Sequence, residues 1–179
     1  MVETLTNTKR EDIECWYDNH SDAILKFILM MVKDYQQAED LTHETFVKAY
    51  IYYDSFQKNS TEKTWLFSIA HNVTMDYFRK RKPMQLFKDL IGSKRDHSRL
   101  PQELIELKET SLELYQALEK LKESHRKVII LRKIQGFSVK DTANILNWSE
   151  SKVKSIQFRA LPALKKQLVK DGYVYEKTI

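Results

Sequence analysis

Apolar residues recur at intervals of three and four through the first 82 positions, a spacing that places them on one face of an α-helix. Three stretches with this pattern are predicted to be helices, over residues 13–33, 37–53 and 61–82. Three amphipathic helices of this length can close one hydrophobic core, so residues 12–82 are predicted to form a helical domain. The inward positions are Ile13, Tyr17, His20, Ile24, Phe27, Met31, Ala38, Leu41, Thr45, Ala49, Tyr52, Leu66, Ile69, Ala70, Val73 and Tyr77.

The pattern changes at Pro83, which is expected to end the third helix because proline has no backbone N–H and clashes with the preceding turn. Residues 83–105 mix glycine, proline and scattered charge with a small apolar patch, and are predicted to be a flexible linker with room for a short helix. Helical periodicity returns over 106–168, which are predicted to form a second helical domain. Its first two helices are expected at 107–122 and 124–134.

Two short helices joined by a tight turn follow, and each has its own start signal. Ser138 can cap the first helix, with Asp141 three residues later completing a capping-box pattern. Asn147 stands where the turn needs a residue that tolerates positive φ, and Ser149 can cap the second helix. This arrangement predicts a helix-turn-helix, whose second helix is the type that enters the major groove of DNA.

Composition supports an all-α fold of two small helical domains joined by a flexible linker, with the helix-turn-helix in the C-terminal domain. The 179 residues include 3 Gly and 3 Pro, few for a protein built from strands and turns. The single cysteine, Cys15, excludes an internal disulfide, and its place on an amphipathic helix favours an idle thiol over a nucleophile. No apolar run reaches membrane-spanning length and the first residues lack a signal-peptide core, so a cytoplasmic protein without direct membrane insertion is expected.

The net charge of +5 is divided into alternating blocks. Residues 1–50 hold 5 Lys and Arg against 10 Asp and Glu, and residues 100–125 hold 3 against 6. Residues 79–99 hold 8 against 2, and residues 126–170 hold 11 against 2. Neutralisation of phosphates explains the two basic blocks, whereas an acidic first segment repels DNA and indicates a protein partner.

One face of the second predicted helix is acidic. Asp40, His43, Glu44 and Val47 are spaced to lie together, opposite the inward positions. A solvated acidic surface and a docking surface for a basic partner both fit this pattern. A zinc protease site does not fit, because position 47 lacks the second histidine that such a motif needs.

The outward face of the third predicted helix mixes an aromatic ring, an amide and basic groups. A tryptophan can stack on an unpaired base, an asparagine can bond to base edges, and the basic end can neutralise phosphates. The alternative is that Trp65 lies partly in the core and that the charges only solubilise the helix. His71, at the edge of this face, is expected to have a structural role. The face comprises Trp65, Ser68, Asn72, Met75, Asp76, Arg79, Lys80, Arg81 and Lys82.

The second helix of the helix-turn-helix has an apolar side and a basic side. Val153, Ala160 and Leu164 are expected to face inward. This pattern is typical of a recognition helix anchored by its apolar side, although a basic solvated helix is the alternative. The residues expected to face outward or to flank that side are Ser151, Lys152, Lys154, Ser155, Phe158, Arg159, Lys165 and Lys166.

Three motifs in this order resemble the bacterial RNA polymerase sigma factors, in particular the small two-domain extracytoplasmic-function (ECF) group. Residues 38–46, AEDLTHETF, resemble the segment that binds core polymerase. Residues 63–72, KTWLFSIAHN, with Asp76 and the basic residues 79–82, resemble the segment that melts and recognises the minus-ten element. Residues 136–155 resemble the helix-turn-helix that reads the minus-thirty-five element.

The resemblance implies a role for each surface and no catalytic chemistry, metal or other cofactor. It implies three partners: core RNA polymerase, promoter DNA and an anti-sigma factor. Residues 54–60 and the third helix would capture unpaired bases of the minus-ten element, and the binding energy would offset the cost of unstacking them. The implied polymerase-binding residues are Asp40, Leu41, His43, Glu44 and Val47. The implied minus-ten residues are Trp65, Ser68, Asn72, Asp76, Arg79, Lys80, Arg81 and Lys82, and the implied minus-thirty-five residues are Ser149, Ser151, Lys152, Lys154, Ser155 and Arg159.

The chain departs from the family pattern at several positions. His43 replaces a common Gln and His71 a common Arg. Ile156 and Gln157 stand where the recognition helix often has Arg and a core Leu, so residue 156 is not counted among the groove contacts. Pro162 falls within what is normally an uninterrupted helix and is expected to kink it or to end it early.

Four classes of function fit these patterns to different degrees. An alternative sigma factor, acting in a stress or envelope response, explains all three surfaces. A homodimeric helix-turn-helix regulator of duplex DNA explains the recognition helix but leaves the acidic face and the row from Trp65 to Asn72 without a role. An adaptor built of helices predicts no binding to nucleic acid, and an enzyme is disfavoured because metal-ligand spacing, phosphate-binding glycine loops and an activated nucleophile are missing.

Overall fold

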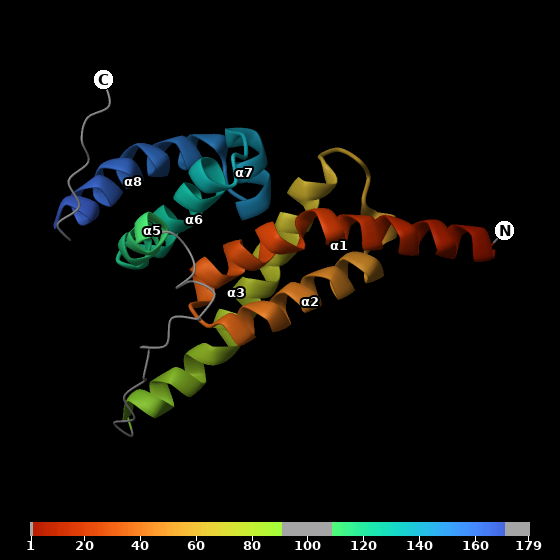
Figure 1. Ribbon diagram of the computed structural model, residues 1–179, viewed down its shortest axis with the longest axis horizontal. Helices are drawn as coiled ribbons and strands as arrows, with labels where there is room; N and C mark the ends of the chain where they lie inside the picture. Colours follow the sequence, from red (N-terminus) through yellow and green to blue (C-terminus); the bar gives the residue numbers. More distant parts are fainter. Residues whose placement is uncertain (1, 91–108, 171–179) are drawn as a thin grey trace. The chain divides into compact units, whose positions relative to one another are not determined.

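The computed structural model describes residues 2–90 and 109–170, and within these ranges every regular element is a helix. The chain divides into two compact units, residues 1–100 and 101–179 (Figure 1). The all-α, two-domain fold class predicted from the sequence is therefore confirmed.

The first unit consists of three long helices and one short turn. Helix α1 spans Val2–Val32, α2 spans Tyr35–Ile51, the 3₁₀ turn η1 spans Tyr53–Ser55, and α3 spans Glu62–Leu90. The three α-helices all pack against one another. Their core includes the fully buried side chains of Ile24, Phe27, Ile28, Met31, Leu66, Phe67 and Val73.

The turn from α1 to α2 is short and capped. Lys33 adopts a positive φ of 63°, which ends α1. Asp34 then caps α2, since its carboxylate accepts the backbone N–H of Gln37 at 3.0 Å. This compact turn holds α1 and α2 side by side and antiparallel.

Several boundaries differ from those predicted. Helix α1 begins at Val2 rather than near residue 13, because charged helix formers extend it toward the N-terminus. The Arg10–Glu14 ion pair at 2.7 Å stabilises this extension. Pro83 does not end α3, which continues to Leu90, so the prediction was wrong. The backbone N–H that proline lacks removes only a single helical hydrogen bond. Tyr52 is also misassigned to the core, since it is 56% exposed just beyond the end of α2.

The second unit is built from shorter helices. Helix α5 spans Glu109–Glu119, α6 spans Glu123–Ile129, the π-helical turn η2 spans Ile130–Ile134, α7 spans Val139–Leu146 and α8 spans Glu150–Lys170. Helices α5, α6 and α7 each pack on α8. The core side chains are Ala117, Leu118, Val128, Ile129, Ile130, Leu131, Ile145, Leu146, Val153, Ile156 and Ala160.

The helix-turn-helix has the caps that the sequence predicted. The Ser138 hydroxyl accepts the backbone N–H of Asp141 at 3.0 Å at the start of α7. Asn147 ends α7 in the left-handed conformation, with φ 52° and ψ 49°. The Ser149 hydroxyl accepts the N–H of Lys152 at 3.2 Å at the start of α8. These three residues fix the angle at which α8 leaves the turn.

Two further predictions concern Pro162 in α8 and the linker at residues 83–105. Pro162 lies inside α8, which continues to Lys170, so an early end of this helix is contradicted. Most of the predicted linker, residues 91–105, lies outside the described residues, and residues 83–90 belong to α3.

Candidate nucleic-acid interface

The predicted docking face on α2 is an exposed surface with one exception. Asp40, His43 and Glu44 are exposed, and Val47 is 58% exposed. Leu41 is only 3% exposed and belongs to the core, as its inward position predicted, which corrects the polymerase contact that the resemblance implied for it. Its role is therefore to anchor α2 beneath the acidic face. Glu44 is held in place by Lys48, one turn later, with the ammonium nitrogen 3.0 Å from Oε1.

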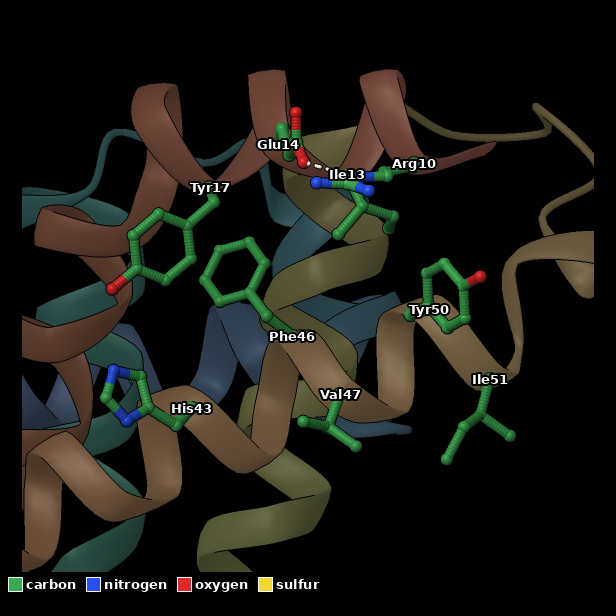
Figure 2. A pocket seen from close by; sticks show the side chains of 9 residues that line it. All are labelled: Arg10, Ile13, Glu14, Tyr17, His43, Phe46, Val47, Tyr50 and Ile51. Atoms are coloured by element: carbon green, nitrogen blue, oxygen red, sulfur yellow. Dashed lines mark hydrogen bonds and ion pairs between the residues drawn. The ribbon is translucent and has the colours of Figure 1, made fainter. Parts of the chain in front are cut away.

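An apolar groove, which the sequence reasoning missed, runs beside this face between α1 and α2. Figure 2 shows Ile13 and Tyr17 of α1 opposite Phe46 and Val47 of α2, with the Arg10–Glu14 pair at the rim. The open groove has a volume of about 430 Å³. The ring of Tyr17 lies 4.8 Å from that of Phe46 and 6.4 Å from that of His43. The full lining is Arg10, Ile13, Glu14, Tyr17, His43, Phe46, Val47, Tyr50 and Ile51.

The sequence did carry a signal for this groove. Val47, Tyr50 and Ile51 are apolar positions off the inward stripe of α2, and their side chains are 58%, 40% and 60% exposed. A contiguous exposed apolar patch marks a binding surface more often than isolated apolar side chains do. The groove and the acidic face share His43 and Val47, so the two form one continuous surface.

The outward face of α3 is polar at its centre and basic at its end. Asn72 is exposed, whereas Ser68 is half-buried and donates to the Thr64 carbonyl at 3.0 Å. Asp76 pairs with Arg79 at 2.6 Å. Arg79, Lys80 and Arg81 are exposed, and the side chain of Lys82 lies outside those that the structure describes. The exposed polar groups suited to nucleic acid are therefore Asn72 and the basic residues 79–81, of which Arg79 pairs with Asp76 and Arg81 donates to the Tyr77 hydroxyl. His71 is buried at 8% exposure, as its structural role predicts.

Trp65 is half-buried, which favours the alternative that it lies partly in the core. Its ring packs on Phe56 at a centroid distance of 5.1 Å and meets Trp16 edge-on at 6.0 Å. Trp16 also stacks on Tyr53 at 5.7 Å. The four rings join α1, the segment between α2 and α3, and α3 itself, so Trp65 has a partly exposed ring held in a fixed orientation.

Helix α8 presents a polar and basic face to solvent. Ser149, Ser151, Lys152, Lys154 and Ser155 are all exposed. The guanidinium of Arg159, also exposed, donates to the Ser155 hydroxyl at 3.1 Å and to the Ser155 carbonyl at 3.2 Å. These bonds hold the arginine along the exposed face of the helix.

The ammonium group of Lys152 lies 4.1 Å above the Trp148 ring, a cation–π contact on the turn that precedes α8. The neighbouring His125 on α6 has its pKa lowered, chiefly by burial and also by the positive charges of Lys122 and Arg159. A lowered pKa keeps this imidazole neutral near pH 7, so the positive charge at this edge of α8 comes from the lysine and arginine side chains.

The inward side of α8 explains the departure at positions 156 and 157. Ile156 is 6% exposed, so it makes no groove contact. The Gln157 amide oxygen accepts the Arg132 Nε at 2.9 Å, and the same guanidinium donates to the Phe137 carbonyl. Arg132 thereby joins η2, the approach to α7 and the recognition helix.

Phe158 is the residue on α8 that the sequence reasoning undervalued. Its side chain is 81% exposed and lies two turns after Ser151 and one turn after Ser155 on the outward side. Apolar side chains in the major groove can contact the methyl group of thymine. Phe158 therefore belongs with the outward groups of α8 rather than with the flanking ones.

Within residues 2–90 and 109–170, no helix is long and apolar enough to cross a membrane. The same part of the chain contains no cluster of three or more His, Cys, Asp or Glu side chains that could hold a metal ion.

Both units match known families. Residues 16–83 match Sigma-70 region 2, and residues 117–166 match Sigma-70 region 4. The chain is 39% identical to the ECF RNA polymerase sigma factor SigX of Bacillus subtilis over 165 residues, covering 88% of this chain and 84% of SigX. It is 36% identical to SigM of the same organism over 151 residues, covering 83% of this chain and 90% of SigM.

A solved structure agrees with these matches. The sigma factor RpoE of Bartonella quintana, in complex with the anti-sigma factor NepR, superposes with a TM-score of 0.74 at 28% identity, covering 90% of this chain and 99% of RpoE. The chain therefore belongs to the ECF sigma factors of RNA polymerase, a family of regulatory DNA-binding proteins. As a member it binds core polymerase and directs promoter-specific initiation of transcription.

Proposed function

We propose that three surfaces of this sigma factor bind three different partners or DNA elements. The acidic face of α2 and the adjoining groove dock on core polymerase. The outward face of α3 and the preceding loop, residues 54–60, capture unpaired bases of the minus-ten element. Helix α8 reads the minus-thirty-five element as duplex DNA. The observation that carries this proposal is the separation of exposed charge, with acidic groups on α2 and basic groups at residues 79–81 and on α8.

The chemistry of each surface fits its proposed partner. Asp40 and Glu44 present exposed carboxylates, that of Glu44 beside Lys48, and the apolar lining of the groove can receive the ridge of a partner helix. Asn72 offers both a donor and an acceptor to an extruded base, and Arg79 to Arg81 face the backbone of the same strand. On α8, a helix capped at Ser149 projects Ser155, Phe158 and Arg159 together.

The proposal extends to regulation and location. We infer that an anti-sigma factor holds this chain inactive, since the RpoE protein that it resembles is bound to one. The chain acts in the cytoplasm, where polymerase and DNA are found, in a stress or envelope response. It performs no catalysis itself, because the polymerase carries out RNA synthesis.

In vitro transcription tests this proposal. Purified core polymerase and the chain are incubated with fragmented genomic DNA of the source bacterium, and the transcript starts are mapped. The expected result is a set of starts that require the chain and share sequence at minus ten and minus thirty-five. Absence of any start that depends on the chain, with a housekeeping sigma factor active in parallel, would refute the proposal.

A further inference from the structure

The loop proposed to capture unpaired bases is fastened to α1 by a hydrogen bond that no motif in the sequence indicated. The hydroxyl of Tyr53, in η1, donates to the Asp12 carboxylate. Asp12 is 41 residues earlier in the chain, so the bond closes a long-range contact at the start of the loop. It raises the pKa of Tyr53 to about 12, chiefly because the carboxylate favours the protonated phenol.

An aromatic cluster completes this attachment. The ring of Trp16, one turn after Asp12 on α1, stacks on Tyr53 with an interplanar angle of 28°. The same ring meets Phe56, within the loop, edge-on at 5.5 Å. Phe56 in turn packs on Trp65 of α3. Aromatic pairs at these distances favour particular ring orientations, in addition to burying apolar surface. They therefore favour one position of the loop on α1.

Charged contacts reinforce both ends of the loop. The Lys9 ammonium lies 3.5 Å from the Asp54 carboxylate and 4.7 Å from the centroid of the Tyr50 ring. At the other end, His20 Nε2 lies 3.6 Å from the Glu62 carboxylate at the start of α3. Ion pairs with a solvent-exposed partner are individually weak, and the His20 contact is an ion pair only when the imidazole is protonated, so the Tyr53 hydroxyl and the aromatic cluster carry most of the attachment.

Between these attachments the loop is open to solvent. Gln57, Lys58 and Asn59 are exposed, and Lys58 adopts a positive φ of 55°. A binding segment that is already ordered loses less conformational entropy when it captures its ligand. The contacts at Tyr53 and Phe56 thus order the flanks of the segment whose tip faces the DNA.

We propose that Asp12, Trp16 and Tyr53 are positioning residues for promoter opening, which hold the 54–60 loop on α1 in the conformation that receives an unpaired base. They touch neither polymerase nor DNA and act through the loop. This inference rests on the proposed function of the loop and adds to it a role for the first turns of α1.

The test uses holoenzyme, four single variants of the full chain and the double variant Asp12→Ala with Tyr53→Phe. Tyr53→Phe and Asp12→Ala each remove the hydrogen bond, whereas Asp12→Asn retains an amide oxygen that accepts it. Tyr52→Phe is the matched control, because it removes the hydroxyl of the adjacent exposed tyrosine. The probe is a fluorescent single-stranded oligonucleotide with the non-template minus-ten sequence of a promoter mapped by in vitro transcription.

Tyr53→Phe and Asp12→Ala are expected to weaken binding of this oligonucleotide by roughly threefold to tenfold, the loss of one hydrogen bond. The double variant is expected to lose no more than either single variant, and Asp12→Asn is expected to bind much as the wild type. Trypsin cleavage after Lys58, followed by mass spectrometry, is expected to accelerate in the two weakened variants and not in Tyr52→Phe.

Two further measurements separate positioning from general stability and from failure of the base-capture proposal. Affinity for core polymerase is expected to stay within error of the wild type, and the unfolding temperature of the first unit is expected to fall only by the few degrees that one hydrogen bond is worth. A parallel loss of polymerase affinity, or unchanged oligonucleotide binding by Tyr53→Phe, overturns the positioning role. If the wild-type holoenzyme itself does not bind the oligonucleotide, the proposed function of the loop is refuted, and the positioning role is refuted with it.

Discussion

Phe158 gives the recognition helix an apolar group among polar ones. A phenyl ring that is 81% exposed in the free chain contributes to binding only if a ligand covers it. In the major groove, the apolar group available at a base edge is the thymine methyl. We therefore expect Phe158 to favour thymine at one position of the minus-thirty-five element.

Replacement of a single thymine by deoxyuridine tests this contact, because it removes only the methyl group. At the contacted position, the wild type is expected to lose about fourfold in affinity, the value of roughly 0.8 kcal/mol for one buried methyl group. Phe158→Ala is expected to bind the two DNAs equally. The measurement is a competition assay in which deoxyuridine replaces each thymine of the duplex in turn.

Val169→Ala provides the control for this experiment. Val169 is also an exposed apolar residue of α8, at 59%, but it lies near the end of the helix. It is expected to discriminate thymine from deoxyuridine as the wild type does. If Phe158→Ala keeps the same discrimination, the thymine contact is wrong.

At the scale of elements, the turn between α7 and α8 depends on the backbone of one residue. Asn147 has a φ of 52°, a conformation that asparagine and glycine tolerate and that costs other L-residues about 1 kcal/mol or more. The Trp148 N–H also bonds to the Ala143 carbonyl at 2.9 Å, which closes the end of α7. The left-handed backbone of Asn147 is therefore the part of the turn in which the entry angle of the recognition helix depends most on residue type.

Asn147→Ala is expected to destabilise the second unit by about 1 kcal/mol, whereas Asn147→Gly is expected to change its stability by a few tenths. Amide hydrogen exchange of residues 139–160 measures this difference without interference from the first unit. Equal protection in the two variants would show that the turn does not constrain α8.

The helix-turn-helix was the element best predicted from the sequence, because each of its signals is local. Ser138, Asn147 and Ser149 act on residues no more than four positions away, and a pattern of this kind is readable in one dimension. The first residues of α1 and the passage of α3 through Pro83 were not predicted. Both depend on the balance of helix propensity and tertiary packing over many residues, in which one proline or a run of charges does not decide the outcome.

The candidate site was predicted in part for the same reason. Helical periodicity was enough to identify the exposed Asp40, His43 and Glu44. It did not identify the groove or the Asp12–Tyr53 bond, because both join residues distant in sequence and require the packing of α1 on α2. Leu41 shows the opposite error, since a family motif includes core residues together with surface ones.

For the whole molecule, the two units make binding to polymerase and binding to duplex DNA separable properties. The docking face lies in the unit of residues 1–100, and α8 lies in the unit of residues 101–179. Substitutions in one unit that share no contact with the other are expected to act independently. The acidic face can therefore be inverted without loss of the fold of the DNA-reading unit.

Asp40→Arg combined with Glu44→Arg is expected to weaken binding to core polymerase by at least about tenfold, since like charges then oppose across the interface. The isolated chain is expected to bind minus-thirty-five duplex as well as the wild type does. Surface plasmon resonance with immobilised polymerase and with immobilised duplex measures the two properties. Asp18→Arg with Asp22→Arg is the control, because it makes the same change of charge at exposed positions of α1. An equal effect of both pairs on polymerase binding would contradict the docking assignment.

Pro162 has a consequence for which part of α8 determines promoter preference. Lacking an N–H, it leaves the carbonyl of Phe158 without its usual helical donor, so α8 loses a backbone bond where its DNA-facing row ends. The turns before it are fixed by the buried Val153, Ile156 and Ala160. Substitutions in the last turns of α8, after Pro162, are therefore expected to leave promoter preference unchanged, because that preference depends on residues 150–161.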